Sequence, residues 1–94
     1  MTDQPKKYRK KPVVVEAMQF LGMEHPSIDT VAAWISEGGC GDMMLFPGLL
    51  IIPTLEGNMA AKPGDWIIKG TRGEFYPCEL GVFEEVYEEA ESDD

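Results

Sequence analysis

The stretch that most constrains the fold is residues 62–87, where turn signals and short apolar runs follow one another closely. Pro63-Gly64 is typical of a turn, because proline fixes one φ angle and glycine readily adopts a positive one. Residues 65–69 then alternate around two apolar side chains, and the glycines of residues 70–73 can turn the chain back into residues 74–77. The sequence therefore predicts a β-hairpin in this stretch.

One helix is expected earlier in the chain, at residues 28–37. Ile28, Val31 and Ile35 recur at the helical period. Gly38-Gly39 follows directly and is a strong signal for the end of a helix. A helix of about ten residues does not persist alone in water, so we expect it to pack on a sheet.

The remaining strands are expected on both sides of that helix. Residues 13–20 open with three valines after Pro12 and predict a strand, which we expect to be central because its valines are apolar on both faces. Pro47-Gly48 joins residues 43–46 to residues 49–52 and predicts a second hairpin, followed by a short strand or bridge at residues 59–61.

The end of the chain is harder to assign, since residues 80–87 fit a helical turn or a strand. We expect a turn followed by a short strand. The predicted fold class is α+β, with a small antiparallel sheet or a partly open barrel of five to six short strands and one packed helix. We expect the core to include Trp66, Ile68, Phe75 and Phe83.

Charge divides the 94 residues into three parts, although the length suits a single domain. Five of the eight lysines and arginines lie in the first eleven positions, and eight of the seventeen acidic residues follow from Glu79 onward. We expect a mobile basic arm at 1–11, one domain at 12–87 and a disordered acidic tail at 88–94.

The charges also bear on the partners of the chain. A basic arm can bind phosphates through counterion release, but the net charge of −9 opposes contact with nucleic acid. We therefore do not expect nucleic acid to be the main partner, and whether the arm binds anything stays open.

The sequence predicts no membrane span, metal, cofactor or enzymatic activity. No apolar run approaches the roughly 18 residues of a spanning helix, and the N-terminus lacks the apolar region of a signal peptide. Cys40 and Cys78, with His25 as the one histidine, cannot form a four-ligand site from Cys and His alone. We expect both thiols to be free and neither to act as a nucleophile.

The run from residue 43 to residue 52 is the most apolar part of the chain. It can belong to the core, but in so small a protein it can also face a partner protomer. We therefore expect a homo-oligomer as one alternative. The candidate interface residues are Met43, Met44, Leu49 and Leu50.

A ligand site is a second candidate, around the turn at residues 70–73. Backbone N–H groups and cations there could meet a phosphate, and nearby aromatic rings could stack on a base. The alternative is a plain hairpin turn with exposed charges. The candidate ligand-binding residues are Lys69, Arg72, Glu74, Trp66 and Tyr76.

Four motifs carry a resemblance to a known family. They are KKPVVVEAMQF at 10–20, PGDWIIKG at 63–70, GEFYP at 73–77 and FEEVY at 83–87. Together they resemble a family of small proteins from tailed bacteriophages and prophages, with a variable middle between residues 21 and 61. Cys78 and Gly81 depart from the family pattern, so neither counts as a signature position.

The resemblance implies an accessory phage protein made in the cytoplasm of a bacterial host. With no catalytic set in the sequence, we expect a non-catalytic binding module that acts on a host or phage protein. The alternatives are sequestration of a nucleotide-type small molecule used in antiphage defence, and a structural or assembly role in the phage.

Overall fold

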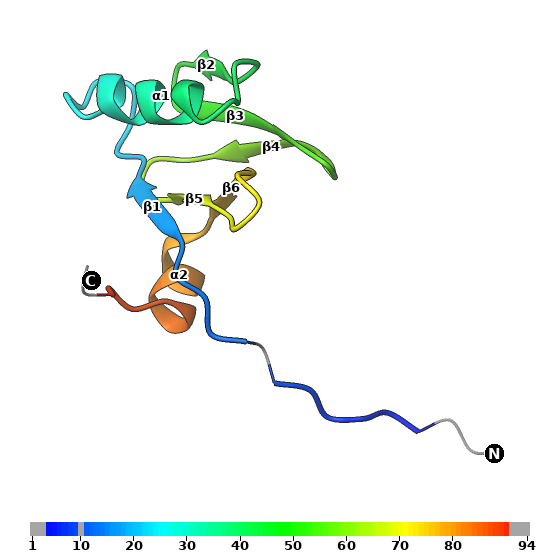
Figure 1. Cartoon of the computed structure of the whole chain (residues 1–94). Coiled ribbons are helices and arrows are strands. Elements are labelled where there is room, and N and C mark those ends of the chain that lie inside the picture. The colour runs from blue at the N-terminus through cyan, green and yellow to red at the C-terminus, as the bar shows by residue number, and fades with distance from the viewer. Residues whose placement is uncertain (1–3, 10, 91–94) are drawn as a thin grey trace.

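The computed structural model describes residues 4–9 and 11–90, which form six strands and two helices (Figure 1). In chain order these are β1 (Glu16–Gln19), α1 (Ile28–Glu37), β2 (Met44–Phe46), β3 (Leu49–Thr54), β4 (Gly57–Ala61), β5 (Trp66–Lys69), β6 (Phe75–Cys78) and α2 (Leu80–Val86). The α+β class is confirmed, and α1 has the predicted bounds. The parts of the predicted arm and tail at residues 1–3, 10 and 91–94 lie outside the described residues.

The strands form two antiparallel sheets rather than one sheet or a barrel. Sheet A has the strand order β1-β5-β6, and sheet B has the order β2-β3-β4. The two sheets meet where β6 contacts β3 and β4. Both predicted hairpins are present, β2–β3 around Pro47-Gly48 and β5–β6 around residues 70–73.

The first strand is shorter than predicted and lies at an edge of sheet A. Glu16 is paired with Lys69 at the last position of β5, after which Gly70 begins the turn. The valines that precede Glu16 therefore extend past the end of their neighbour, and Val13 and Val14 are exposed. The prediction of a central strand at residues 13–20 was wrong, because β1 pairs with β5 alone and β5 is too short to pair with the valines.

The main core lies between the inner faces of the two sheets and α1. Alternate residues of β3 point into it, so Leu50 and Ile52 are fully buried while their neighbours are not. The buried residues of this core are Phe20, Val31, Ile35, Leu50, Ile52, Ala61, Ile67 and Phe75.

Trp34 attaches α1 to sheet A. Its indole N–H donates a hydrogen bond to Oε1 of Glu16 at 3.2 Å. Its ring meets Phe75 edge to face, with ring centroids 5.2 Å apart. One side chain of the helix thus contacts both outer strands of sheet A.

The end of the chain forms helix α2, not the predicted short strand. Phe83 stacks on Trp66 with ring centroids 4.3 Å apart, and Tyr87 stacks on Phe83 at 5.1 Å. Residues four apart are neighbours on a helix but about 13 Å apart along a strand, so this stack requires helical geometry. Neither helix in the described part of the chain is long and apolar enough to cross a membrane.

The aromatic stack gives sheet A a second packed face, away from the main core. Trp66 and Ile68 lie on this face, and Ile68 is fully buried. Phe75 points the other way, into the main core. The four residues expected to build one core are therefore divided between the two faces of sheet A.

Candidate functional site

The structure separates the residues predicted to bind a ligand. In the β5–β6 hairpin Trp66 is opposite Cys78, Ile68 is opposite Tyr76 and Lys69 is opposite Phe75. Side chains alternate between the faces of a strand, so Trp66 and Tyr76 share one face of sheet A and Lys69 lies on the other. The Lys69 ammonium is instead 5.9 Å from the centroid of the Phe75 ring.

Glu74 and Arg72 are engaged within the turn itself. The backbone N–H of Arg72 donates to Oε1 of Glu74 at 3.0 Å, and the N–H of Gly70 donates to the backbone oxygen of Glu74 at 2.7 Å. A Cβ atom at Gly70 would collide with the Glu74 carboxylate. These contacts use N–H groups that a phosphate would need, and they favour the alternative of a plain hairpin turn.

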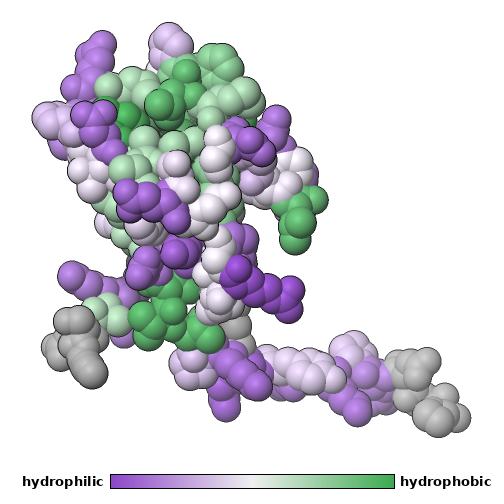
Figure 2. All heavy atoms as spheres, turned by 45° about the horizontal axis from the view of Figure 1, so that its top comes forward, coloured by the Kyte–Doolittle hydropathy of each residue, from purple (hydrophilic) through white to green (hydrophobic). Residues whose placement is uncertain are grey.

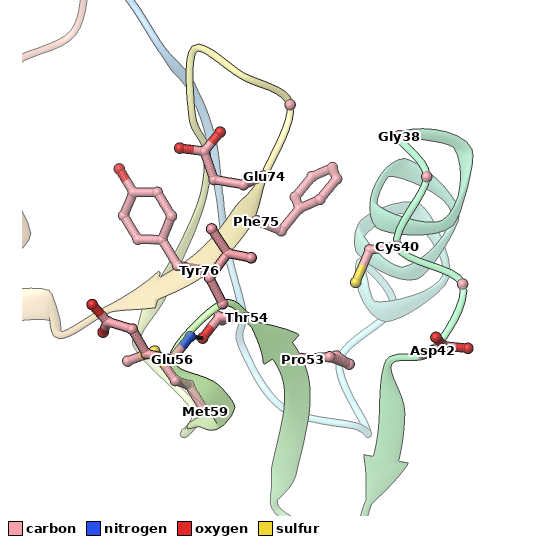
Figure 3. A pocket seen from close by; sticks show the side chains of 14 residues that line it. Gly38, Cys40, Asp42, Pro53, Thr54, Glu56, Met59, Glu74, Phe75 and Tyr76 are labelled. Carbon is pink, nitrogen blue, oxygen red and sulfur yellow. Dashed lines mark hydrogen bonds between the residues drawn. The ribbon is translucent and has the colours of Figure 1, made fainter.

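A cleft of about 640 Å³ lies beside this turn, between the loop that follows α1, the β3–β4 hairpin and β6. Figure 3 shows Glu56, Glu74 and Tyr76 on one side of it and Cys40 and Asp42 on the other. The fourteen described residues that line the cleft include three carboxylates and no lysine or arginine. Its charge therefore disfavours a phosphate-bearing ligand.

The two thiols are poorly suited to nucleophilic chemistry. Burial, and then the negative charge of Asp42, raise the pKa of Cys40. Burial, and then the charge of Asp65, raise the pKa of Cys78. A raised pKa lowers the fraction of thiolate near neutral pH. Among residues 4–9 and 11–90, no group of three or more His, Cys, Asp or Glu residues could hold a metal ion.

Tyr76 makes stability depend on pH in the alkaline range. Burial, and then a hydrogen bond with Tyr87, raise the pKa of Tyr76 to about 12, above the value of about 10 for a free tyrosine. The unfolded chain therefore loses this proton first, and we expect the free energy of unfolding to fall as pH rises from about 10 to about 12.

Urea denaturation at a series of alkaline pH values measures this slope. The Tyr76→Phe variant should lose part of it, whereas Tyr8→Phe, in the exposed N-terminal segment, should keep the wild-type slope. Equal slopes in the wild type and in Tyr76→Phe would show that Tyr76 is not responsible.

The predicted interface residues divide between the core and the surface. Leu50 is fully buried, and Met43 is half-buried against the main core. Leu50 is therefore not available to a partner. Met44 and Leu49 point to the other side of sheet B and are 41% and 36% exposed.

Cross-strand pairing shows which side chains lie on the same side of sheet B as Met44 and Leu49. Met44 is opposite Ile51, and Phe46 is opposite Leu49, on the side of sheet B away from Leu50 and Ile52. Phe46 is 46% exposed and Ile51 is half-buried. We call Met44, Phe46, Leu49 and Ile51 the outer face. Figure 2 shows hydrophobic residues gathered at the end of the molecule that carries α1 and β2.

The sequence contained the signal for Phe46 and Ile51, which were not among the predicted interface residues. Residues equally distant from a two-residue turn are cross-strand partners. Counting outward from Pro47-Gly48 pairs Phe46 with Leu49 and Met44 with Ile51, which places the four side chains on one face. Leu50 then belongs to the opposite face.

Comparison with known proteins reveals no relative of this chain. It matches no protein-family model, no curated protein and no solved structure. The resemblance of its motifs to phage proteins therefore stays an expectation.

Proposed function

We propose that the chain is a small accessory protein of a bacteriophage that works as a non-catalytic protein-binding module. Its binding surface is the outer face of sheet B, and its partner is a protein with an apolar, uncharged contact surface. The observation that carries the proposal is that four large apolar side chains share one face of the β2–β3 hairpin and that three of them, Met44, Phe46 and Leu49, are exposed.

The composition of the outer face favours protein contact. Contiguous apolar patches on a small protein commonly mark interaction sites, whereas single exposed apolar residues need no explanation. Burying apolar surface contributes about 25 cal/mol per Å². Phe46 is the largest side chain of the face and the one with the greatest exposed fraction, so we assign it the role of the main anchor.

Two observations disfavour sequestration of a nucleotide. Lys69 lies on the opposite face of sheet A from Trp66 and Tyr76, so it cannot hold a phosphate while these rings stack on the base. The adjoining cleft is lined by the carboxylates of Asp42, Glu56 and Glu74. A protein partner on the outer face contacts neither Lys69 nor this cleft.

Site-specific photo-crosslinking in bacteria that produce the chain tests the proposal. A benzophenone amino acid replaces Phe46 on the outer face or, as a control, Val82, which is equally exposed on α2. We expect a crosslinked protein adduct at position 46 that disappears when Leu49→Glu is added. No adduct at position 46, or equal adducts at both positions, would contradict the proposal.

A further inference from the structure

We infer that the protein held by the outer face is a second copy of this chain, packed sheet B against sheet B about a two-fold axis. This inference rests on the proposed function, because it names the partner of the same surface. It is carried by the distribution of charge over the fold, together with the alternation of β2 and β3.

A two-fold contact sets a surface against itself, so a charge near the axis meets its own like charge. This restriction is severe for a chain in which 27% of residues are charged and the net charge is −9. Residues 43–55 contain no charged residue, and Asn58 and Ala60, which continue the outward side of sheet B on β4, are also uncharged. The next residue on that side, Lys62, is charged and exposed, but it lies beyond the end of β4. Two copies that meet over β2 and β3 therefore avoid repulsion between like charges.

Three other surfaces of the described chain do not meet this condition. The exposed side of α2 carries Glu84 and Glu85, β1 begins with the exposed Glu16, and the cleft beside β6 is lined by three carboxylates. Self-contact at any of these places would bring acidic groups together. A partner other than a second copy could supply compensating cations, so only self-association requires a surface without charge.

The size of the outer face sets the expected strength of the contact. Sheet B has three strands about 4.8 Å apart, and its longest strand, β3, has six residues of about 3.3 Å each, so the whole outward side of the sheet measures at most roughly 14 by 20 Å. This is smaller than the roughly 800 Å² that each partner contributes to a standard stable interface. We therefore expect a weak dimer, with a dissociation constant of about 10–100 µM, in which the two faces pack about 10 Å apart.

Sedimentation equilibrium of the full chain from about 5 to about 500 µM measures the association. We expect the mass to rise from monomer to dimer across this range. Phe46→Glu and Leu49→Glu each place a carboxylate on the outer face and should remain monomeric throughout. Leu55→Glu is the matched control, because Leu55 is fully exposed at the tip between β3 and β4 and should dimerise like the wild type.

Opposite charges at one position make the test independent of folding defects. Phe46→Glu and Phe46→Lys should each be monomeric alone and should form a heterodimer when mixed, which misfolded chains would not do. A wild-type chain that stays monomeric at about 500 µM, or a Phe46→Glu chain that still dimerises, would overturn the inference. If the wild type is monomeric while position 46 crosslinks to a different protein in bacteria, the second copy is excluded and the proposed function stands. If neither occurs, both fail.

Discussion

Replacing Ile52 with alanine is expected to lower the free energy of unfolding by about 2–5 kcal/mol, whereas the same change at the neighbouring Ile51 is expected to cost about 1 kcal/mol. Ile52 is fully buried in the main core, while Ile51 is half-buried on the outer face. The two variants remove the same atoms from adjacent positions, so the difference between them reports the orientation of β3.

Guanidinium denaturation of both variants, at concentrations well below those of self-association, measures the two losses. A domain of this size has a total stability of about 5–15 kcal/mol, so the Ile52→Ala variant loses a large share of it. Equal losses at the two positions would mean that β3 does not alternate as described. The outer face would then not exist as an exposed surface.

Replacing Gly38 with alanine is expected to lower the free energy of unfolding by about 1–3 kcal/mol, although Gly38 is only the residue that ends α1. An alanine Cβ would collide with Cζ of Phe75 and lie 2.7 Å from its Cε2. Phe75 is buried in the main core and held edge to face by Trp34. Neither the ring nor the helix end can move away without disturbing the other.

Two further variants control this second prediction. A Cβ at Gly41 meets no atom within 4 Å, so Gly41→Ala should leave stability nearly unchanged. In the Gly38→Ala background, Phe75→Leu should lower the free energy of unfolding by less than it does in the wild type, because the smaller side chain relieves the collision. Full stability of Gly38→Ala would show that α1 does not approach β6 as closely as described.

The elements predicted correctly from the sequence are those with local signals. The helix period of residues 28–37 and the glycines after them defined α1. Pro47-Gly48 and the glycines of residues 70–73 defined the two hairpins. In each case the residues that determine the element lie within it or directly beside it.

The errors in the fold arose where a distant segment decides the outcome. Residues 80–86 fit a helix or a strand on their own, and the stack of Phe83 and Tyr87 on Trp66 selects the helix. The valines at residues 13–15 favour a strand, but β5 ends too early to pair with them. The separation into two sheets likewise depends on how β6 packs against β3 and β4.

The candidate site shows the same limit. Proximity in sequence grouped Lys69 with Trp66 and Tyr76, although alternation along β5 and β6 places them on opposite faces. Met43, Met44, Leu49 and Leu50 were predicted together as interface residues, although Leu50 is buried. Counting the register of the β2–β3 hairpin from its turn places Met44 and Leu49 on the outer face and Leu50 on the side of the core.

The central claim, that a second copy of this chain contacts the outer face, is tested most directly by methyl NMR of the full chain at increasing concentration. The methyl signals of Met44, Leu49 and Ile51 should shift with concentration, while those of Leu50 and Ile52 inside the core and of Val82 and Val86 on α2 should shift much less or not at all. Shifts confined to α2, or no shift at any methyl group up to about 500 µM, would contradict the claim.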